Sequence, residues 1–217
     1  MKILELFAGS RSIGKAAEEL GFEVFSSDIT DFGGIDYVVD MLDFDIKQLP
    51  WRPDIVWASP PCTGFSVAAI GHHWTGGKNA YIPKTDTARL GIELLRKTIA
   101  VIDELQPCAF FIENPRGLMR KMPEVARFNR DTVTYCQYGD KRMKPTDIWH
   151  NTRWQPRPMC KNGDPCHEAA PRGSRTGTQG LKNNHERSKI PHELCIEVLN
   201  AVAQSQENPH FFGKLLV

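Results

Sequence analysis

Apolar and polar positions follow two different periods along the first two thirds of the chain. Short runs of apolar and β-branched residues, typical of buried strands, alternate with segments in which apolar residues recur at helical spacing. The short runs predict strands at residues 3–7, 23–27, 37–39, 54–58, 109–112, 132–136 and 146–149. The helical spacing predicts helices that run from a cap at Ser10 or Ser12 to Leu20, over 85–105 and over 190–203. This alternation predicts an α/β fold with a mostly parallel sheet flanked by helices.

Two segments follow neither period. Residues 63–85 contain four glycines together with His72, His73 and Trp74, and they predict a long loop, which in compact domains is often functional. Between 151 and 187, glycine, proline, asparagine and basic residues dominate, which predicts a small irregular lobe. We therefore expect a core over 1–150, a small basic lobe over 151–187, and a C-terminal helical segment over 188–217 that completes the core.

Charge is distributed unevenly along the chain, although the net charge is only +1. Residues 1–60 carry 5 Lys/Arg against 11 Asp/Glu, whereas residues 116–189 carry 16 Lys/Arg against 7 Asp/Glu. An acidic first part suits a cofactor with hydroxyl and amine groups, and a basic later part suits a polyanion such as nucleic acid. An uneven scatter of surface charges is the simpler alternative.

The apolar runs are too short for a membrane protein. None approaches the roughly 20 residues that a membrane-spanning helix needs, and residues 1–5 do not have the features of a signal peptide. We therefore expect a cytoplasmic protein without membrane contact. In that compartment its six cysteines are expected to be reduced thiols, metal ligands or catalytic groups.

Glycine and acidic residues follow the first three predicted strands. Leu6-Phe7-Ala8-Gly9 closes the first strand, where a glycine lets the backbone approach a ligand placed over a helix N-terminus. Asp28 lies 19 residues after Gly9, a spacing at which an acidic residue holds a nucleoside ribose. Asp40 follows the third strand and is placed to accept from an adenine amine. Each aspartate alone is better explained as a turn or cap residue, but together they predict a nucleoside-type cofactor at this edge.

A thiol and a carboxylate follow the next two strands. Cys62 stands in Ser59-Pro60-Pro61-Cys62-Thr63-Gly64-Phe65-Ser66, just past the fourth strand, and Glu113 begins Glu113-Asn114-Pro115 after the fifth. Because both strands end at the same sheet edge, the pair predicts a nucleophile beside an acid. The alternatives are a small buried hydrophobic residue for Cys62 and a helix cap for Glu113.

These motifs, in this order and spacing, resemble the cytosine-5 DNA methyltransferase family over nearly the whole chain. Leu6-Phe7-Ala8-Gly9 is similar to its first cofactor motif, Pro61-Cys62 with Phe65-Ser66 to its Pro-Cys motif, and Glu113-Asn114 to its Glu-Asn motif. Two further matches are looser, namely Tyr138–Lys144 to a later basic motif and Ser188–Pro191 with the following helix to the last motif. The resemblance implies a Rossmann-like class I fold and transfer of a methyl group from S-adenosylmethionine to carbon 5 of a cytosine flipped out of double-stranded DNA.

The resemblance also implies roles for individual residues. Cys62 would attack carbon 6, and Glu113 would contact ring nitrogen 3. The catalytic group implied is Cys62, Glu113, Asn114 and Lys144. The cofactor-binding group implied is Phe7, Ala8, Gly9, Ser10, Asp28, Ile29, Asp40, Met41, Ser59 and Pro60. The nucleic-acid-binding group expected is Pro61, Ser66, Arg142, Arg153, Arg172 and Arg175.

The chain departs from the family pattern in three places. Ser10-Arg11-Ser12 replaces the usual glycine-rich continuation, Pro115 stands where valine is usual, and only residues 151–187 remain of the usual recognition domain. The short lobe predicts brief or relaxed sequence specificity that depends on phosphate contacts, or specificity supplied by a partner protein. The compact size suits a bacteriophage or mobile-element enzyme that marks DNA against restriction.

The lobe has a spacing of thiols and imidazole that suits a metal. Cys160, Cys166 and His167 predict a structural zinc site in a segment too small for a core of its own. The fourth ligand is open between Cys136, His150 and His185. Two reduced thiols in a loop are the alternative.

Three other functions compete with DNA cytosine-5 methylation. An exocyclic amino-methyltransferase would carry an aromatic residue in place of Cys62 and would need no nucleophile. A tRNA cytosine-5 methyltransferase would share the same chemistry. A catalytically silent DNA-binding module would keep the fold, but it would not need both Cys62 and Glu113.

Overall fold

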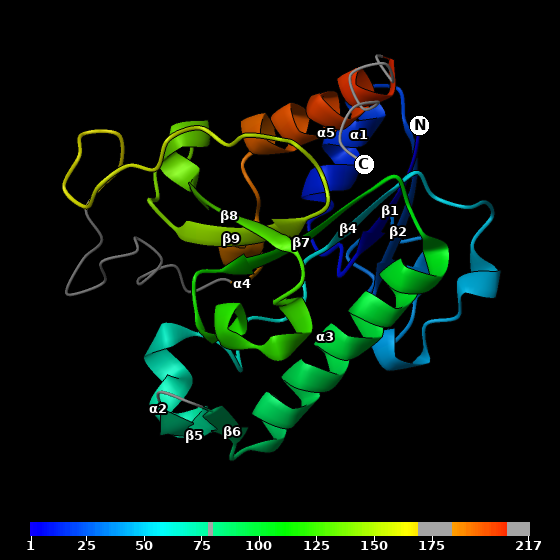
Figure 1. The fold of residues 1–217 in the computed structure, drawn as a ribbon. Helices are drawn as coiled ribbons and strands as arrows, with labels where there is room; N and C mark the ends of the chain where they lie inside the picture. Colours follow the sequence, from blue (N-terminus) through cyan, green and yellow to red (C-terminus); the bar gives the residue numbers. More distant parts are fainter. Residues whose placement is uncertain (78–79, 169–183, 208–217) are drawn as a thin grey trace, which may run out of the picture.

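The computed structural model describes residues 1–77, 80–168 and 184–207. Its centre is a seven-stranded sheet with helices on both faces (Figure 1). The strands of this sheet are β1 (Lys2–Leu6), β2 (Glu23–Asp28), β3 (Tyr37–Val38), β4 (Ile55–Ala58), β7 (Ala109–Pro115), β8 (Asn129–Thr134) and β9 (Pro145–His150). The predicted α/β fold, with a mostly parallel sheet flanked by helices, is confirmed.

The strand order reverses in the middle of the sheet. The order is β3-β2-β1-β4-β7-β9-β8, and the first five strands run parallel. Between β1 and β4 the chain switches direction, and in such sheets ligands bind at the carboxyl ends of the strands beside this switch point. Strand β9 is antiparallel to both β7 and β8, so its amino end lies at that same edge.

Helices cover the two faces of the sheet and create two hydrophobic cores. Neighbouring strand residues such as Ile3 and Leu4 contribute to opposite cores, which explains why most positions of the central strands are apolar. Helices α1 (Ser12–Glu19) and α5 (His192–Glu207) cover one face, and α3 (Asp86–Leu105) covers the other (Figure 1). The short 3-10 helices are η1 (Met41–Asp43), η2 (Ile46–Gln48), η3 (Val67–Ala69), η4 (Leu118–Lys121), η5 (Pro123–Val125) and η6 (Tyr135–Tyr138). Among the described residues, no helix combines the length and apolarity that crossing a membrane would need.

Helix α1 begins differently from the prediction. Its N-cap is Arg11, in the left-handed region at φ 54°, and neither predicted serine caps the helix. Instead, the buried carboxylate of Glu5 in β1 accepts from the backbone N–H groups of Ile13 and Gly14, both at 3.1 Å. Because the first turn of a helix has unpaired N–H groups and positive dipole character, a carboxylate there replaces a serine cap.

The segment 63–85 contains regular structure, so the prediction of a plain loop was wrong. It holds α2 (Ile70–His73) and an antiparallel hairpin of β5 (Trp74–Gly77) and β6 (Ala80–Pro83). Trp74 is 3% exposed, lies beside the ring of Phe65 and donates from Nε1 to the Gly64 carbonyl at 2.6 Å. Four-residue strands are too short to show a period in the sequence, whereas this buried tryptophan gives the hairpin a fixed position.

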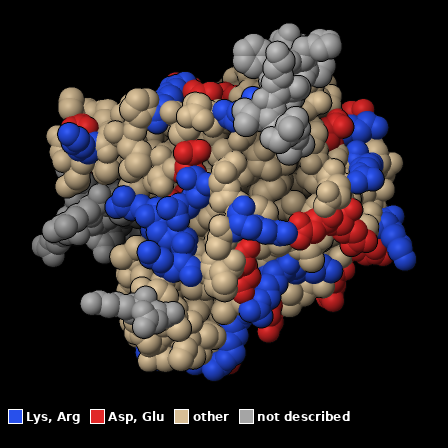
Figure 2. All heavy atoms as spheres, viewed as in Figure 1, with Lys and Arg blue, Asp and Glu red and all other residues tan. Residues whose placement is uncertain are grey.

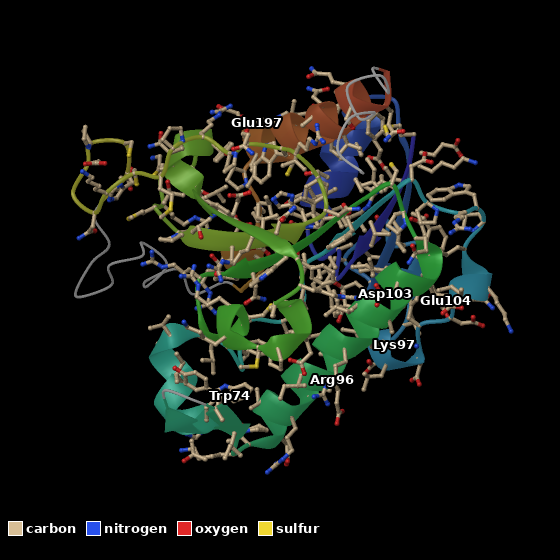
Figure 3. The ribbon with its side chains drawn as sticks, in the orientation of Figure 1. Trp74, Arg96, Lys97, Asp103, Glu104 and Glu197 are labelled. Atoms are coloured by element: carbon tan, nitrogen blue, oxygen red, sulfur yellow. The ribbon has the colours of Figure 1, made fainter. Side chains whose placement is uncertain are left out.

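The described part of the lobe is held against α5. Glu197 accepts from Tyr138, Trp154 and Arg157, with distances of 3.3, 3.1 and 2.8 Å (Figure 3). Residues 151–168 have no helix or strand, as expected, whereas α4 (Asn184–Ser188) is a short helix that the composition did not indicate. The division of the chain at 150 and 187 remains a prediction.

Gly117 is expected to be essential for the fold around the Cys62 segment. A Cβ atom at this position would overlap the backbone oxygen of Phe65, which accepts from the Leu118 N–H at 2.8 Å. Gly117→Ala should lower the free energy of unfolding by about 1–3 kcal/mol in urea titrations. Gly77→Ala is the control, because a Cβ there meets no atom within 4 Å. Equal stability of the two variants would contradict this close packing.

Candidate active site

Side chains from six strands converge at one edge of the sheet. Strands β1, β2, β4 and β7 end there, and the register pairs Leu6 with Ala58 and Ala58 with Ile112. Glu113 follows Ile112 directly, and Cys62 lies four residues past the end of β4. The antiparallel β9 brings Lys144, the residue before it, to the same edge, and Tyr135 follows the end of β8 there.

The glycine turn after β1 is tied to the end of β2. The Gly9 N–H donates to Asp28 Oδ2 at 2.9 Å, and Gly9 has φ 48°, in the left-handed region where glycine avoids strain. Asp28 Oδ1 also accepts from the Thr30 N–H at 3.0 Å. A carboxylate has about four lone-pair sites, so two remain for a ligand. Phe7, at φ 56°, completes this unusual turn, and Ala8 is buried beneath it.

Other residues predicted to contact a cofactor lie in mixed environments. Ile29 is 65% exposed directly after Asp28, so its side chain is open to a ligand. Asp40 caps η1 by accepting from the Leu42 N–H at 2.9 Å, which is the alternative that its position also suggested. Met41 packs its side chain in the core. Ser10 lies farther along the turn, with its Oγ 2.8 Å from Ser12 Oγ.

The segments around Cys62 and Glu113 are joined directly. Asn114 donates from Nδ2 to the Pro60 carbonyl at 2.8 Å, so the residue after the acid holds the turn that carries the thiol. Asn114 is 1% exposed, and its Oδ1 has no hydrogen-bond partner within the described residues. Ser59 fixes the start of this turn, because its N–H donates to the Leu6 carbonyl at 3.2 Å and its Oγ accepts from Trp57. Pro61 and Ser66 lie on the same turn.

Glu113 is buried beside a tyrosine and a lysine. Glu113 is 5% exposed, and its Oε1 accepts from the Tyr135 hydroxyl at 3.1 Å. Lys144 is equally buried, and its Nζ lies 4.4 Å from the centre of the Tyr135 ring. The same Nζ donates to the Arg187 carbonyl at 3.0 Å, and the Lys144 backbone has φ 28°. Lys144 thus approaches the site despite its imperfect match to the expected motif.

The charges of this cluster shift one another's titration. Burial raises the pKa of the Glu113 carboxyl, while Lys144, Tyr135 and Ser59 act to lower it. Cys62 is exposed as a residue, yet desolvation of its sulfur raises the pKa of the thiol, as does Glu113, whereas Lys144 and Arg187 lower it. Burial lowers the pKa of Lys144, and Glu113 opposes that effect. Burial therefore makes it easier for Glu113 to hold a proton, whereas the charge of Lys144 favours ionisation of the Cys62 thiol.

Two residues of this edge were missing from the sequence prediction. Tyr135 was placed inside a predicted strand at 132–136, although β8 ends at Thr134 and Tyr135 begins η6. Because the predicted strand continued to residue 136, inspection of the residues past its end would not have found Tyr135. Glu5 was assigned only to a strand, but burial raises its pKa from 4.5 to about 7 beneath the first turn of α1.

The residues predicted to bind nucleic acid are only partly described. Arg142 is engaged within the protein, because it pairs with Asp140 at 2.5 Å and donates to carbonyls of residues 186, 187 and 189. Arg153 is exposed on the lobe. Arg172 and Arg175 lie outside the described residues. Lys and Arg side chains nevertheless form a group left of centre on the face shown in Figure 2.

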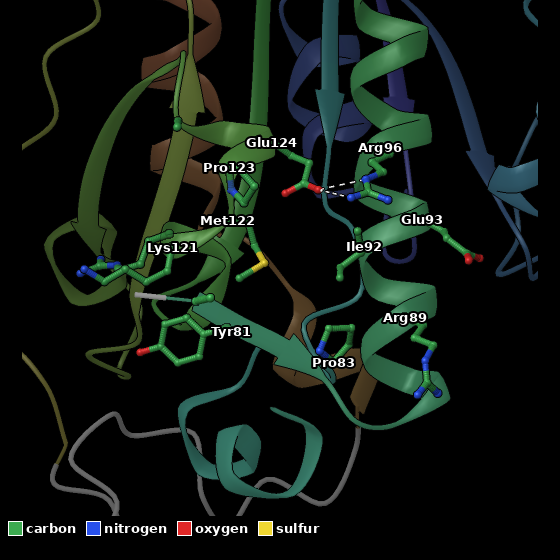
Figure 4. A pocket seen from close by; sticks show the side chains of 13 residues that line it. Tyr81, Pro83, Arg89, Ile92, Glu93, Arg96, Lys121, Met122, Pro123 and Glu124 are labelled. Carbon is green, nitrogen blue, oxygen red and sulfur yellow. Dashed lines mark hydrogen bonds and ion pairs between the residues drawn. The ribbon is translucent and has the colours of Figure 1, made fainter. Parts of the chain in front are cut away.

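A separate groove of about 810 Å³ lies between β6, α3 and the segment around η4 and η5 (Figure 4). Its cationic side chains include Arg89, Arg96 and Arg120, and these form ion pairs with Asp86, Glu124 and Asp147 respectively. The predicted catalytic residues do not line this groove. It is therefore a mixed-charge surface separate from the Cys62 cluster.

The cysteine and histidine side chains of the lobe lie together. Cys160, Cys166 and His167 join Cys136 in a cluster whose ligand atoms are all within 4.8 Å of one another. His150 is elsewhere, with its Nε2 2.9 Å from Asp131 Oδ2. The side chain of His185 lies outside the described residues.

The comparisons with known proteins agree with the geometry. The family described as C-5 cytosine-specific DNA methylase matches residues 1–130. A protein of Frog virus 3 (isolate Goorha), named "Probable DNA (cytosine-5)-methyltransferase", is 32% identical and covers 92% of this chain and 99% of its own length. Among solved structures, a DNMT2 mutant of Spodoptera frugiperda is 20% identical over 70% of this chain and 51% of its own, with a TM-score of 0.42. The Dnmt2 methyltransferase of S. pombe is 14% identical over 69% of this chain and 48% of its own, with a TM-score of 0.44. This chain thus spans about half the length of both solved proteins.

The two charged neighbours of Cys62 are expected to shift its thiol pKa in opposite directions. Glu113→Gln should lower the pH of half-maximal alkylation by iodoacetamide, and Lys144→Met should raise it, each by about one pH unit. The rate of Cys62 alkylation at each pH is measured by mass spectrometry of the peptides that contain this residue. Cys108 in the same samples is the internal control, because its pKa depends on burial and Asp54 instead. Shifts of the same sign in both variants would disprove the arrangement.

Proposed function

Because the chain belongs to the C-5 cytosine-specific DNA methylase family, we propose that it transfers a methyl group to carbon 5 of cytosine in DNA, with Cys62 as nucleophile. The observation that carries this proposal is the meeting of Cys62, Glu113 and Lys144 at one sheet edge. A thiol, an acid of raised pKa and a buried cation are the groups that activation of a cytosine ring requires.

The residues at the ends of β1 and β2 suit S-adenosylmethionine. The Asp28 carboxylate retains acceptor sites for ribose hydroxyls, and the exposed Ile29 offers an apolar surface for the adenine. There is space beside the Gly9 turn, because within the described residues, its two chain neighbours apart, a Cβ there would meet just the Phe7 carbonyl oxygen, at 4.0 Å. When bound, this cofactor supplies an electrophilic methyl group. The chain's part is to hold it beside the crevice between β1 and β4.

The reaction on cytosine begins at Cys62. Its thiolate forms a bond to carbon 6, and the electron pair of the 5,6 double bond moves into the ring, where Glu113 donates a proton to nitrogen 3. Carbon 5, now electron-rich, would take the methyl group as the bond between that group and the cofactor sulfur breaks, and nitrogen 3 would return its proton to Glu113. Loss of the carbon 5 proton to a base then restores the double bond and breaks the bond between sulfur and carbon 6, which releases Cys62 as thiolate.

Tyr135 and Lys144 assist this sequence by holding charge. The Tyr135 hydroxyl donates to Oε1 of Glu113 and so fixes the orientation of the carboxyl group that contacts the cytosine. Lys144 favours the thiolate of Cys62 and is buried on the Tyr135 ring, so its ammonium has little freedom. The cytosine must leave the helix to reach these groups, at a cost of a few kcal/mol in lost stacking.

We propose that DNA is bound mainly through its phosphates, with brief or relaxed sequence specificity. The exposed Arg153 and the basic group seen in Figure 2 support contacts to the backbone of a polyanion. Specificity supplied by a partner protein is the alternative. Binding measurements on DNA duplexes of different sequence test the proposal. Relaxed binding through phosphates predicts that affinity falls steeply as the salt concentration rises and changes little from one sequence to another.

We also propose that the lobe holds a structural zinc ion through Cys160, Cys166 and His167. Support comes from their clustering and from the small apolar content of the described part of the lobe, residues 151–168, where Trp154 and Cys160 are the buried hydrophobic residues. The ion takes no chemical part in methyl transfer.

Replacement of the nucleophile tests the proposed reaction. Cys62→Ala should lower radiolabelled methyl transfer from S-adenosylmethionine to duplex DNA by more than about 1,000-fold, while cofactor affinity stays within twofold. Cys108→Ala, at an exposed thiol far along the chain, is the control and should keep full activity.

The same assay separates the competing functions. Transfer to tRNA but not to DNA would indicate an RNA enzyme, and activity retained by Cys62→Ala would indicate an exocyclic nitrogen as the target. DNA binding without any transfer would indicate a silent binding module. Each of these results would overturn the proposal.

Tyr135 is expected to be a positioning residue for Glu113. Tyr135→Phe keeps the ring beneath Lys144 but removes the hydroxyl, so kcat should fall about tenfold while the KM values for DNA and cofactor change little. Tyr138→Phe is the matched control, because that hydroxyl contacts Glu197 away from the site. Equal effects of the two substitutions, or an effect on KM alone, would exclude this role.

A further inference from the structure

The cysteine and histidine cluster draws its members from two parts of the chain. Cys136 belongs to η6, just past β8, whereas Cys160, Cys166 and His167 belong to the lobe. Cys136 Sγ lies 3.1 Å from Cys160 Sγ and 3.6 Å from Cys166 Sγ. His167 Nδ1 lies 3.8 Å from Cys160 Sγ and 3.6 Å from Cys166 Sγ. A tertiary contact between η6 and the lobe therefore creates a group that neither segment holds alone.

Three of these four separations, at 3.6–3.8 Å, suit a tetrahedral metal site, and the fourth, 3.1 Å between the sulfur atoms of Cys136 and Cys160, is shorter. Zinc with bonds of about 2.3 Å to sulfur and about 2.0 Å to nitrogen keeps its ligand atoms roughly 3.5–3.8 Å apart. A disulfide would need about 2.05 Å between sulfur atoms, so the described thiols are not bonded in pairs. Gln137 donates from Nε2 to Cys166 Sγ at 3.4 Å, which is the kind of outer hydrogen bond that stabilises a thiolate ligand.

The segment between Cys136 and Lys144 connects this cluster with the active site. Met143 packs against Cys136 and Cys160, and its carbonyl accepts from the Tyr135 N–H at 2.8 Å. Tyr135 precedes Cys136, Lys144 follows Met143, and both reach the active site. The Tyr135 hydroxyl donates to Glu113, and the Lys144 ammonium lies over the Tyr135 ring. The lobe contacts this segment and the residue at the end of β8 just before it. The Glu168 N–H donates to the Lys141 carbonyl at 2.9 Å, and the Cys160 N–H donates to the Thr134 side-chain oxygen at 3.0 Å.

We propose that Cys136 is the fourth ligand of the zinc ion, and that the metal thereby fixes the segment 135–144 so that Tyr135 and Lys144 keep their places beside Glu113. This inference rests on the zinc site and the methyl transfer proposed above. His150, the other described candidate, is excluded by its bond to Asp131. Binding releases three thiol protons to solvent and leaves zinc with three thiolates and one neutral imidazole, a closed structural site without an open position.

Metal content and ligand identity are measured first, on the full chain without DNA. Protein purified with zinc should contain one zinc per chain, and X-ray absorption should show three sulfur ligands and one nitrogen ligand at about 2.3 and 2.0 Å. Cys136→Ser and Cys166→Ser should each lower zinc affinity at least tenfold, whereas Cys108→Ser should leave it unchanged. The spectrum of the unmodified protein decides the ligand set even if a variant fails to fold.

Three results would overturn the metal assignment. These are a chain without zinc, a disulfide between Cys136 and Cys160 in protein prepared under reducing conditions, and a spectrum with only two sulfur ligands. None of them depends on catalysis, so they are distinct from a failure of the proposed reaction.

The link to the active site is tested by removing the metal. Chelator-treated protein should bind S-adenosylmethionine with affinity within twofold of the untreated protein, because that site lies at the ends of β1 and β2. Its methyl transfer rate should fall at least tenfold and return when zinc is added back. An unchanged rate in zinc-free protein would contradict the link and leave the ligand set intact. Absence of transfer in zinc-loaded protein would instead contradict the proposed function.

Discussion

The buried carboxyl group of Glu113 constrains the rest of the active site. An ionised carboxylate at 5% exposure would cost several kcal/mol without partners, and here a tyrosine hydroxyl, a serine hydroxyl and a lysine ammonium surround it. The lysine reaches it because β9 runs antiparallel to β7, which brings the start of one strand to the end of the other. The serine follows β4 and the tyrosine follows β8, and both strands also end at this edge. The mixed topology of the sheet thus places Glu113, whose pKa is raised by burial, beside the Cys62 thiol.

A second buried acid, Glu5, stabilises the backbone beside the expected cofactor site. Glu5 replaces a serine cap at the first turn of α1, and Asp28 holds the neighbouring Gly9 turn from β2. Both contacts join a loop after β1 to a carboxylate that a strand carries. These contacts stabilise the turn that contains Ser10-Arg11-Ser12, in which Arg11 adopts the left-handed region. The departure at Ser10-Arg11-Ser12 is thus compensated by side chains that the motif itself does not include.

The sequence was sufficient for the parts of this account that follow from strand ends. Glu113 comes directly after one apolar run and Cys62 four residues after another, so their meeting could be predicted from topology. Tyr135 could not, because the predicted strand continued past Thr134, and its role depends on a side-chain contact across 22 residues. The hairpin of β5 and β6 was missed because its strands are too short for a period. Cys136 stayed one of three candidates because its distance from Cys160 is set by how the lobe folds onto η6, which no local pattern encodes.

The most direct test of the central claim is mass spectrometry of the protein mixed with S-adenosylmethionine and duplex DNA that contains 5-fluorocytosine. Fluorine cannot leave carbon 5 as a cation, so elimination is blocked after methyl transfer and the bond between sulfur and carbon 6 persists. The account predicts a covalent adduct at Cys62, absent from Cys62→Ala. Methylation of ordinary DNA without any adduct on the fluorinated DNA would contradict it, because the methyl group would then reach cytosine without attack by this thiol.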